Sequence, residues 1–541
     1  MDARIKNILN ACLIIIIFLI AIFKKSIFEN IHNYLLISVY LIAIGLIVFL
    51  IINFKGIIKS FKISKNTKII FLIFILVMLI LKFIVMPNFL GIYVDEVMRI
   101  DAAKNIATKN SAVICEPGFE KEFCSKIFVP IGWPFIMSLF FRLGLINNLA
   151  LINFSIMIGI INIVLIFGLT YLLFKNEHIA LFSSVVFGLD KLNLIWSNSA
   201  NDFNAQVFFI FLTAISFLHF SKEKNLKSGF LFVFSYLFLV YVRTEMALLI
   251  IPLAVYFFLK KNYISKKHIP LALTSIVFIL ILLLFIPTLI NTQEAFRKNG
   301  VENNFSFSET VTFQLKDSIN NITNGTYYSL TFIIILIIGL SACLKSFRDE
   351  SWFLISWFIT FFFLYNLINI EKFYKFYFSF FIPMIIFISY GVWEIGKYIL
   401  HLDLFKRETS RKLQLVFIVL IMSLIFYNPV QIYGDIEKRS SLLTKLPYLL
   451  EKDIPNDCNV LSGEAIIISS VTDVNAISAF DFSEREEEII SSLKGKCLLF
   501  IDNMYCDRGK GCDYIKNNYN TEEFKQYKNK NQEFTVYKLL I

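Results

Sequence analysis

Apolar residues recur in long, nearly uninterrupted runs through the first 430 residues of the chain. Most runs are close to the roughly 20 residues that a helix needs to cross a bilayer, so the pattern predicts about thirteen transmembrane helices. The segment 1–25 has no small-residue cleavage site, and we interpret it as the first span. The runs lie at 8–24, 34–53, 69–87, 149–174, 179–196, 204–220, 228–243, 246–260, 269–290, 328–345, 352–370, 376–398 and 412–428.

Basic residues gather in alternate gaps between these runs, whereas a gap such as 197–203 has no Lys or Arg. Loops rich in Lys and Arg stay on the cytoplasmic side of a membrane. The pattern therefore predicts a cytoplasmic N-terminus and places 88–148, 197–203, 243–245, 291–327 and 371–375 outside. The basic gaps contain Lys55 to Lys68, Lys222 to Lys227, Lys260 to Lys267, and Lys406 to Lys412.

The pattern changes after the last apolar run. Residues 430–541 are polar and charged, with strand-like runs at Cys458–Leu461, Cys497–Asp502 and Phe534–Leu540 and helical stretches such as Ser483–Leu493 between them. Alternating strands and helices predict a small α/β domain. We therefore expect a multi-span domain over 1–429 and a soluble domain over 430–541, the latter outside because an odd number of spans precedes it.

Composition and charge narrow the class of protein. Hydrophobic residues make up 57% of the chain and charged residues 17%, which excludes a soluble protein. The net charge of +11 is dispersed among the short loops, so it indicates membrane topology and no nucleic-acid partner. Six cysteines fall in predicted outer regions and permit disulfides such as Cys115–Cys124 and Cys506–Cys512. Unpaired thiols in a reducing habitat are the alternative.

The first predicted outer loop, 88–148, carries the leading candidate site. Asp95 and Glu96 stand side by side shortly after a span, where a carboxylate can bind a metal ion or accept a proton. Helix capping is the alternative for Asp95, which would precede a helix beginning at Glu96. The apolar stretch 133–145 is too short to span comfortably, and we expect a helix in the outer membrane interface with Trp133 as its anchor.

Two further outer turns carry charged residues. The first is the segment 196–206, in which Asp202 begins the next span. In the second, Arg243 and Glu245 lie in a tight turn between two spans. The guanidinium of Arg243 suits a phosphate head group. The alternatives are a helix cap for Asp202 and snorkelling toward phospholipid for Arg243. Lys372 and Lys375 form another outer cluster, suited either to donor phosphate or to an interfacial aromatic and basic belt.

In their order along the chain, these segments resemble a superfamily of polytopic membrane glycosyltransferases. This GT-C-type superfamily includes protein O-mannosyltransferases, aminoarabinose transferases and, more distantly, oligosaccharyltransferases. The similar segments are VDEVMRIDAAKNI, VPIGWPFIMSLFFRLG, WSNSANDFNAQVFFIFLTAISFL and YVRTEMALLIIPL, and the resemblance covers roughly 90–400. The surface helix expected at 133–145 lacks a diagnostic His or second Pro of the family, which leaves the acceptor open.

The resemblance implies an α-helical GT-C-like fold and an inverting glycosyltransferase that uses a polyprenyl- or dolichyl-phosphate-linked sugar. The acceptor would be a glycan, protein or lipid on the outer face of the membrane. Asp95 would be the general base or a tentative ligand of Mg²⁺ or Mn²⁺, and Glu96 would assist it. Donor phosphate would meet Arg243, with Lys375 and Lys372, and the remaining substrate-site residues would be Asp202, Glu245 and Trp133.

Two other classes of protein compete with a transferase. A polytopic transporter or flippase of lipid-linked substrates should show charged residues near the bilayer midplane and inverted repeats. Neither is evident, because most polar candidates gather at one predicted surface. A non-catalytic membrane scaffold would tolerate substitutions at Asp95 and Arg243 but not deletions within 430–541.

Overall fold

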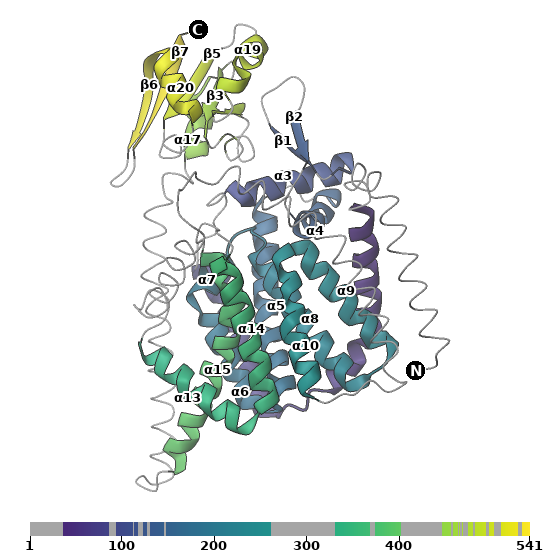
Figure 1. Ribbon diagram of the computed structural model, residues 1–541. Helices are drawn as coiled ribbons and strands as arrows, with labels where there is room; N and C mark the ends of the chain where they lie inside the picture. The colour runs from purple at the N-terminus through teal and green to yellow at the C-terminus, as the bar shows by residue number, and fades with distance from the viewer. Residues whose placement is uncertain are drawn as a thin grey trace.

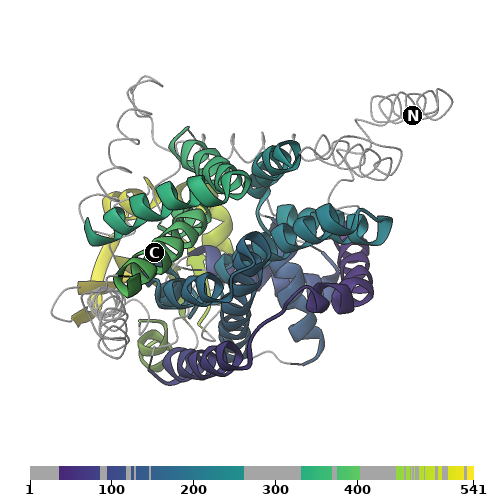
Figure 2. The same cartoon turned by 90° about the horizontal axis from the view of Figure 1, so that it is seen from below.

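The structure is a computed structural model that describes residues 36–85, 94–260, 330–401 and 446–540, with short gaps inside the last three ranges. Its larger part is a bundle of apolar helices, and a small sheet domain lies beyond one end of the bundle (Figure 1). Viewed from below, the helices of the bundle pack side by side (Figure 2). The predicted fold class, a helical polytopic membrane protein with a small C-terminal α/β domain, is confirmed.

Among the described residues, five helices are long and apolar enough to cross a membrane. Shorter apolar helices complete the bundle. The predicted spans at 8–24, 269–290 and 412–428 lie outside the described residues. The five long helices are Leu36–Lys59, Lys65–Ile84, Ala150–Phe174, Phe203–Glu223 and Phe378–Tyr398.

The first two described spans pack mainly through one side. Ser64 begins α2 (Lys65–Ile80) by accepting a hydrogen bond from the Thr67 amide, and a π-helical turn, η1 (Leu81–Val85), follows α2. Large apolar side chains on these spans, such as Ile51 and Leu72, are more than half exposed. Exposed aliphatic side chains along a span are what contact with lipid requires.

The centre of the bundle follows the predicted runs closely. One difference is at 179–196, where Asp190 separates two helices and caps the second by accepting a hydrogen bond from the Asn193 amide. Another is at 246–260, where a 3-10 turn precedes a short helix. The elements are α5 (Asn148–Phe174), α6 (Glu177–Leu189), α7 (Lys191–Trp196), α8 (Phe203–Glu223), α9 (Leu226–Val242), η2 (Thr244–Leu249), α10 (Ile250–Leu259), α13 (Leu330–Ser346), α14 (Arg348–Leu367) and α15 (Tyr374–His401).

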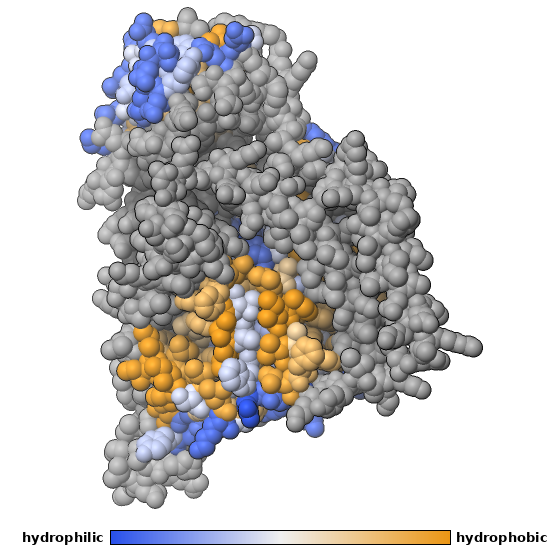
Figure 3. Space-filling view, viewed as in Figure 1, coloured by the Kyte–Doolittle hydropathy of each residue, from blue (hydrophilic) through white to orange (hydrophobic). Residues whose placement is uncertain are grey.

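The apolar and hydrophilic parts of the surface are separated as they are in membrane proteins. Figure 3 shows apolar side chains over the helical body and hydrophilic ones over the sheet domain. Exposed apolar residues on α10, α13 and α14 include Phe258, Ile337 and Phe363. The apolar surface therefore lies on the helices, where the composition of the chain requires contact with lipid.

One end of the bundle carries non-spanning elements, and we call it the α3 end. Helix α3 (Val94–Lys109) lies across this end, beside α4 (Gly132–Arg142) and the hairpin of β1 (Val113–Glu116) and β2 (Phe123–Lys126) (Figure 1). The hairpin register places Cys115 opposite Cys124, one of the cysteine pairs that the sequence permits to form a disulfide.

The C-terminal domain is a five-stranded sheet with strand order β4-β3-β5-β7-β6. The β3–β4 and β3–β5 pairs are parallel, whereas β5–β7 and β6–β7 are antiparallel. Separate apolar clusters include Leu450 of α17 on one side and Phe482 of α19 and Ile515 of α20 on the other. The elements are α17 (Leu446–Asp453), β3 (Cys458–Ser462), β4 (Ala476–Ser478), α19 (Phe482–Leu493), β5 (Cys497–Asp502), α20 (Lys510–Asn518), β6 (Asn520–Lys528) and β7 (Glu533–Leu540).

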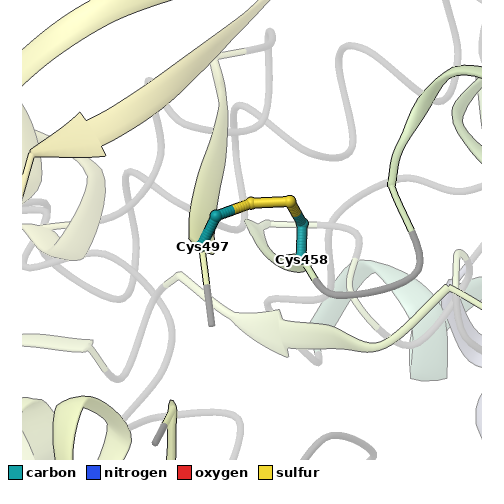
Figure 4. The surroundings of a disulfide bond; sticks show 2 residues. All are labelled: Cys458 and Cys497. Carbon is teal, nitrogen blue, oxygen red and sulfur yellow. A yellow bond between two sulfur atoms is a disulfide. The ribbon is translucent and has the colours of Figure 1, made fainter. Parts of the chain in front are cut away.

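A disulfide joins the first residues of the two central parallel strands. Cys458 of β3 pairs in register with Cys497 of β5, and their sulfur atoms are bonded (Figure 4). Cys512 is also disulfide-bonded, and its predicted partner Cys506 lies outside the described residues. The sequence permitted disulfides in this domain but did not single out the Cys458–Cys497 pair, because the pair depends on strand register.

Candidate functional site

Charged residues from three separate segments meet at the α3 end of the bundle. They come from α3, from the turn between α7 and α8, and from the turn between α9 and η2. Two arginines and two carboxylates alternate in one buried chain of ion pairs, which we call the charge network: Arg99, Asp202, Arg243 and Glu245. Three of its members, Asp202, Arg243 and Glu245, were predicted site residues, and the sequence could not place Asp202 beside the other two.

Asp202 lies at the centre of the charge network. One carboxylate oxygen pairs with the guanidinium of Arg99, and the other lies 3.0 Å from Nη1 of Arg243. The residue occupies the N-cap position of α8, yet its side chain makes no capping hydrogen bond. Its side chain is only 1% exposed. Charge pairing, and not helix capping, therefore accounts for the position of this carboxylate.

Arg243 ends α9 and is held by carboxylates on two sides. Its backbone is extended, its Nε donates to Oε1 of Glu245 over 2.7 Å, and its side chain is buried. Burial by itself lowers the pKa of this guanidinium, but the charges of Glu245 and Asp202 outweigh burial and raise the pKa above its ordinary value. Arg243 is therefore a fixed cation inside the protein, and snorkelling toward phospholipid does not describe it.

Glu96 and Trp133 both bind the backbone of one residue, Ala200, in the turn between α7 and α8. The Glu96 carboxylate accepts a hydrogen bond from the Ala200 amide, and the Trp133 indole donates to the Ala200 carbonyl over 2.8 Å. Trp133 is fully buried, so the expectation that it anchors α4 in the membrane interface is wrong. The indole instead ties α4 to the turn that carries Asp202.

Three predicted site residues have side chains outside the described part of the structure. Asp95 lies in the first turn of α3, which begins at Val94, two residues before the predicted start. Lys375 lies in the first turn of α15, and Lys372 lies outside the described residues altogether. Their predicted roles remain predictions.

The site also contains residues that the sequence argument left out. Arg99 was not among the predicted site residues, and Asn201 accepts a hydrogen bond from it over 3.2 Å. Tyr365 of α14 hydrogen-bonds Ser379 over 3.1 Å and interacts electrostatically with Arg243. The helical spacing of Arg99 from Asp95 and Glu96 was the available signal for Arg99, whereas nothing in the local pattern marked Asn201 or Tyr365.

A divalent cation finds no ready ligand set among the described side chains. No group of three His, Cys, Asp or Glu residues lies close enough there to hold a metal ion. Asp202 and Glu245 are each paired with arginine, and a Ca²⁺ or Mg²⁺ site needs several oxygen ligands that are free to bind. These described residues do not fit a metal ion, and no step of the reaction is assigned to one.

Alanine at Gly132 is expected to force α4 away from α9. A Cβ at this position would lie 2.7 Å from the carbonyl carbon of Tyr241 and 2.8 Å from its oxygen. Backbone atoms cannot rotate away, so we expect a loss of about 1–3 kcal/mol in the free energy of unfolding, together with a displacement of Trp133. Thermal unfolding in detergent measures it.

Gly168→Ala in α5 is the matched control for this substitution. Its Cβ would meet nothing closer than the Phe61 ring at 3.4 Å, an ordinary contact. Equal melting temperatures for the Gly132→Ala and Gly168→Ala variants would contradict the close packing of α4 on α9.

Comparison with known proteins agrees with this architecture. Residues 129–290 match the family model described as dolichyl-phosphate-mannose-protein mannosyltransferase, a region that includes Trp133, Asp202 and Arg243. No curated protein matches the chain.

The fold is similar to solved membrane glycosyltransferases. The structure of ArnT from Cupriavidus metallidurans in the apo state matches with a TM-score of 0.55 and 10% identity, over 87% of this chain and 98% of that one. The Archaeoglobus fulgidus oligosaccharyltransferase tethered with an acceptor peptide matches with a TM-score of 0.52 and 10% identity, over 87% of this chain and 74% of that one.

A third similar structure is archaeal oligosaccharyltransferase AglB from Archaeoglobus fulgidus in complex with an inhibitory peptide and a dolichol-phosphate. Its TM-score is 0.50 at 9% identity, over 87% of this chain and 74% of that one. At these identities the likeness concerns the fold. The chain is therefore a polytopic membrane protein with a GT-C-type fold, and its residues 129–290 are similar to the dolichyl-phosphate-mannose-protein mannosyltransferase family.

Proposed function

We propose that this protein is a glycosyltransferase that moves a sugar from a polyprenyl- or dolichyl-phosphate-linked donor to an acceptor at the extracytoplasmic face of the membrane. The observation that carries the proposal is the buried charge network, of which Asp202, Arg243 and Glu245 lie inside the segment matching the mannosyltransferase family. The AglB complex, with its dolichol-phosphate, supports a lipid-phosphate donor for this fold. The acceptor class, whether glycan, protein or lipid, stays open.

In this proposal Arg243 binds the donor phosphate. The network has two cations and two anions, so it is neutral as a unit. A guanidinium held in place by the carboxylates of Asp202 and Glu245 is a preorganised cation, and such a cation can offset the charge of a phosphate without reorganising the site. Lys375 and Lys372 are proposed as further phosphate contacts.

Asp95 is the proposed general base. It would take the proton of an acceptor hydroxyl while the hydroxyl oxygen attacks the anomeric carbon. The bond from that carbon to the phosphate oxygen breaks, and its electron pair leaves with the lipid phosphate, whose charge Arg243 offsets. A single displacement of this kind inverts the anomeric centre. Glu96 is the weaker candidate for the base, because its carboxylate already binds the Ala200 amide.

The sidedness of the molecule is part of the proposal. We infer that the α3 end faces outward, because the basic gaps of the sequence lie between the spans at the opposite ends of the helices. The domain over 430–541 would then lie outside as well, where its disulfides are favoured.

A role of Asp95 in binding Mg²⁺ or Mn²⁺ stays a proposal, tested by transfer in the presence of a chelator.

The experiment that tests the function uses the full-length protein in vesicles with a panel of radiolabelled sugars. Polyprenyl-phosphate monosaccharides are compared with nucleotide sugars, and vesicles without the protein are the control. Label that moves from a lipid phosphate into a glycan, protein or lipid fraction supports the transferase, and that fraction identifies the acceptor class. Labelled donor that changes leaflet and stays intact would overturn the proposal in favour of a transporter.

A further inference from the structure

Lys82 is a buried lysine at the end of a span, and the proposed mechanism does not use this lysine. It lies in the π-helical turn η1 after α2, and none of its side chain is exposed. A lysine near the end of a span ordinarily extends its ammonium to the membrane surface. Among the described residues no carboxylate forms an ion pair with Lys82. Ionisable side chains in such places are costly and usually functional.

The contacts of Lys82 lead directly to the turn that carries Asp202. Its ammonium donates a hydrogen bond to Oγ of Ser197, and its backbone carbonyl accepts one from the Asn198 side chain over 2.8 Å. One residue of η1 therefore binds two consecutive residues of the turn. Single π-helical turns often occur at functional sites, because they change the direction in which a helix presents its side chains.

The same turn is held at three successive points. Lys82 binds its start at Ser197 and Asn198, Glu96 and Trp133 bind its middle at Ala200, and Arg99 and Arg243 bind its end at Asp202. Asn204 closes the turn by donating to the Ser197 carbonyl over 3.0 Å. Within the described part of the chain, the contacts at the first point involve no carboxylate.

Gly159 of α5 leaves room for the lysine. A Cβ on Gly159 would lie 3.3 Å from Nζ of Lys82, 3.2 Å from Cβ of Ser197 and 3.2 Å from Oδ1 of Asn204. That Asn204 oxygen is buried without a hydrogen-bond partner in the described structure. Any side chain larger than glycine here would press on the lysine and on the turn at once.

We propose that Lys82 is a positioning residue that fixes the turn from Ser197 to Asp202 and so sets the orientation of the Asp202 carboxylate between its two arginines. The catalytic consequence rests on the proposed transfer function, whereas the ordering of the turn does not. An apolar side chain of the same length would fill the space without desolvating an ammonium, so packing alone does not account for a lysine here.

The test compares Lys82→Met with Lys68→Met, the same substitution at an exposed position of α2. Hydrogen–deuterium exchange of the full-length protein in detergent follows the amides of Ser197 to Asp202. Loss of a buried hydrogen bond from a charged donor is expected to speed their exchange by about tenfold or more, with little change in α13 or α14. Gly159→Ala, which keeps the lysine, is expected to change the same amides in the same direction.

Two results would overturn the positioning role. One is unchanged exchange of the turn in the Lys82→Met protein, and the other is faster exchange spread equally over the whole bundle, which marks a general packing defect. Transfer measured on the same samples separates the two proposals. If the wild-type protein transfers no sugar but the turn loosens in the variant, the proposed function fails and the positioning role stands. If transfer and exchange are both unchanged in the variant, the positioning role alone fails.

Discussion

Asparagine in place of Asp202 is expected to destabilise the protein by about 3–5 kcal/mol, the usual effect of removing one partner from a buried ion pair. The carboxylate contacts both Arg99 and Arg243, and it is 1% exposed. An amide of the same shape has no charge, and its NH₂ group faces a guanidinium that cannot accept a hydrogen bond. Thermal unfolding of the purified protein in detergent measures the change.

An exposed ion pair provides the control for Asp202→Asn. Asp349 lies 3.2 Å from Lys260, with 34% of each side chain exposed. Asp349→Asn should change stability by less than about 1 kcal/mol, because solvent screens such a pair. Similar losses in the two variants would show that the charge network does not contribute more than a surface contact.

A second variant separates stability from function. Arg99→Met combined with Asp202→Asn removes one cation together with the carboxylate, and it should recover part of the lost stability, because replacing both partners of a buried pair is far less costly than breaking it. Transfer should stay low in this variant, since Arg243 has lost the partner that positions it. Full recovery of transfer would contradict a role for Asp202 in the site.

Asp95→Asn is expected to lower the rate of sugar transfer by about 10²- to 10⁴-fold, the usual contribution of a general base. The variant keeps the size of the side chain in the first turn of α3 and removes only its ability to take a proton. Donor binding should change little, because Arg243 and not Asp95 is the proposed phosphate contact. Single-turnover transfer from a polyprenyl-phosphate sugar measures the effect.

Glu96→Gln on the same helix distinguishes the two neighbouring carboxylates. The glutamine carbonyl can still accept the hydrogen bond of the Ala200 amide, so we expect a loss of no more than about tenfold if Glu96 only orients the site. Asp101→Asn, further along α3, is the control for a carboxylate outside the network. A larger loss in Glu96→Gln than in Asp95→Asn would reassign the base to Glu96.

The sequence predicted much of the fold because local chemistry determines it. A run of about 20 apolar residues has a single stable environment, a helix in lipid, whatever lies around it. Three strands of the C-terminal domain, β3, β5 and β7, were predicted nearly to the residue, since Cys497–Asp502 was expected and β5 has those bounds. Strands β4 and β6 were not predicted. The break at Asp190 was not predicted, because apolar side chains on both sides of it conceal a change of helix direction.

For the candidate site, the sequence and the tertiary structure determine different features. The sequence by itself indicated that Asp95, Glu96, Asp202, Arg243 and Glu245 lie between spans, since charges are excluded from hydrocarbon. Which charges meet was decided by the tertiary structure: Asp202 and Arg243 are 41 residues apart, and Lys82 reaches Ser197 across 115 residues. Hydrophobic patterning fixes how deep a residue lies in the membrane but not which helices are neighbours. For the same reason Trp133, which the pattern placed in the interface, is buried against Ala200. Only the packing of α4 on the turn provides an acceptor for its indole N–H.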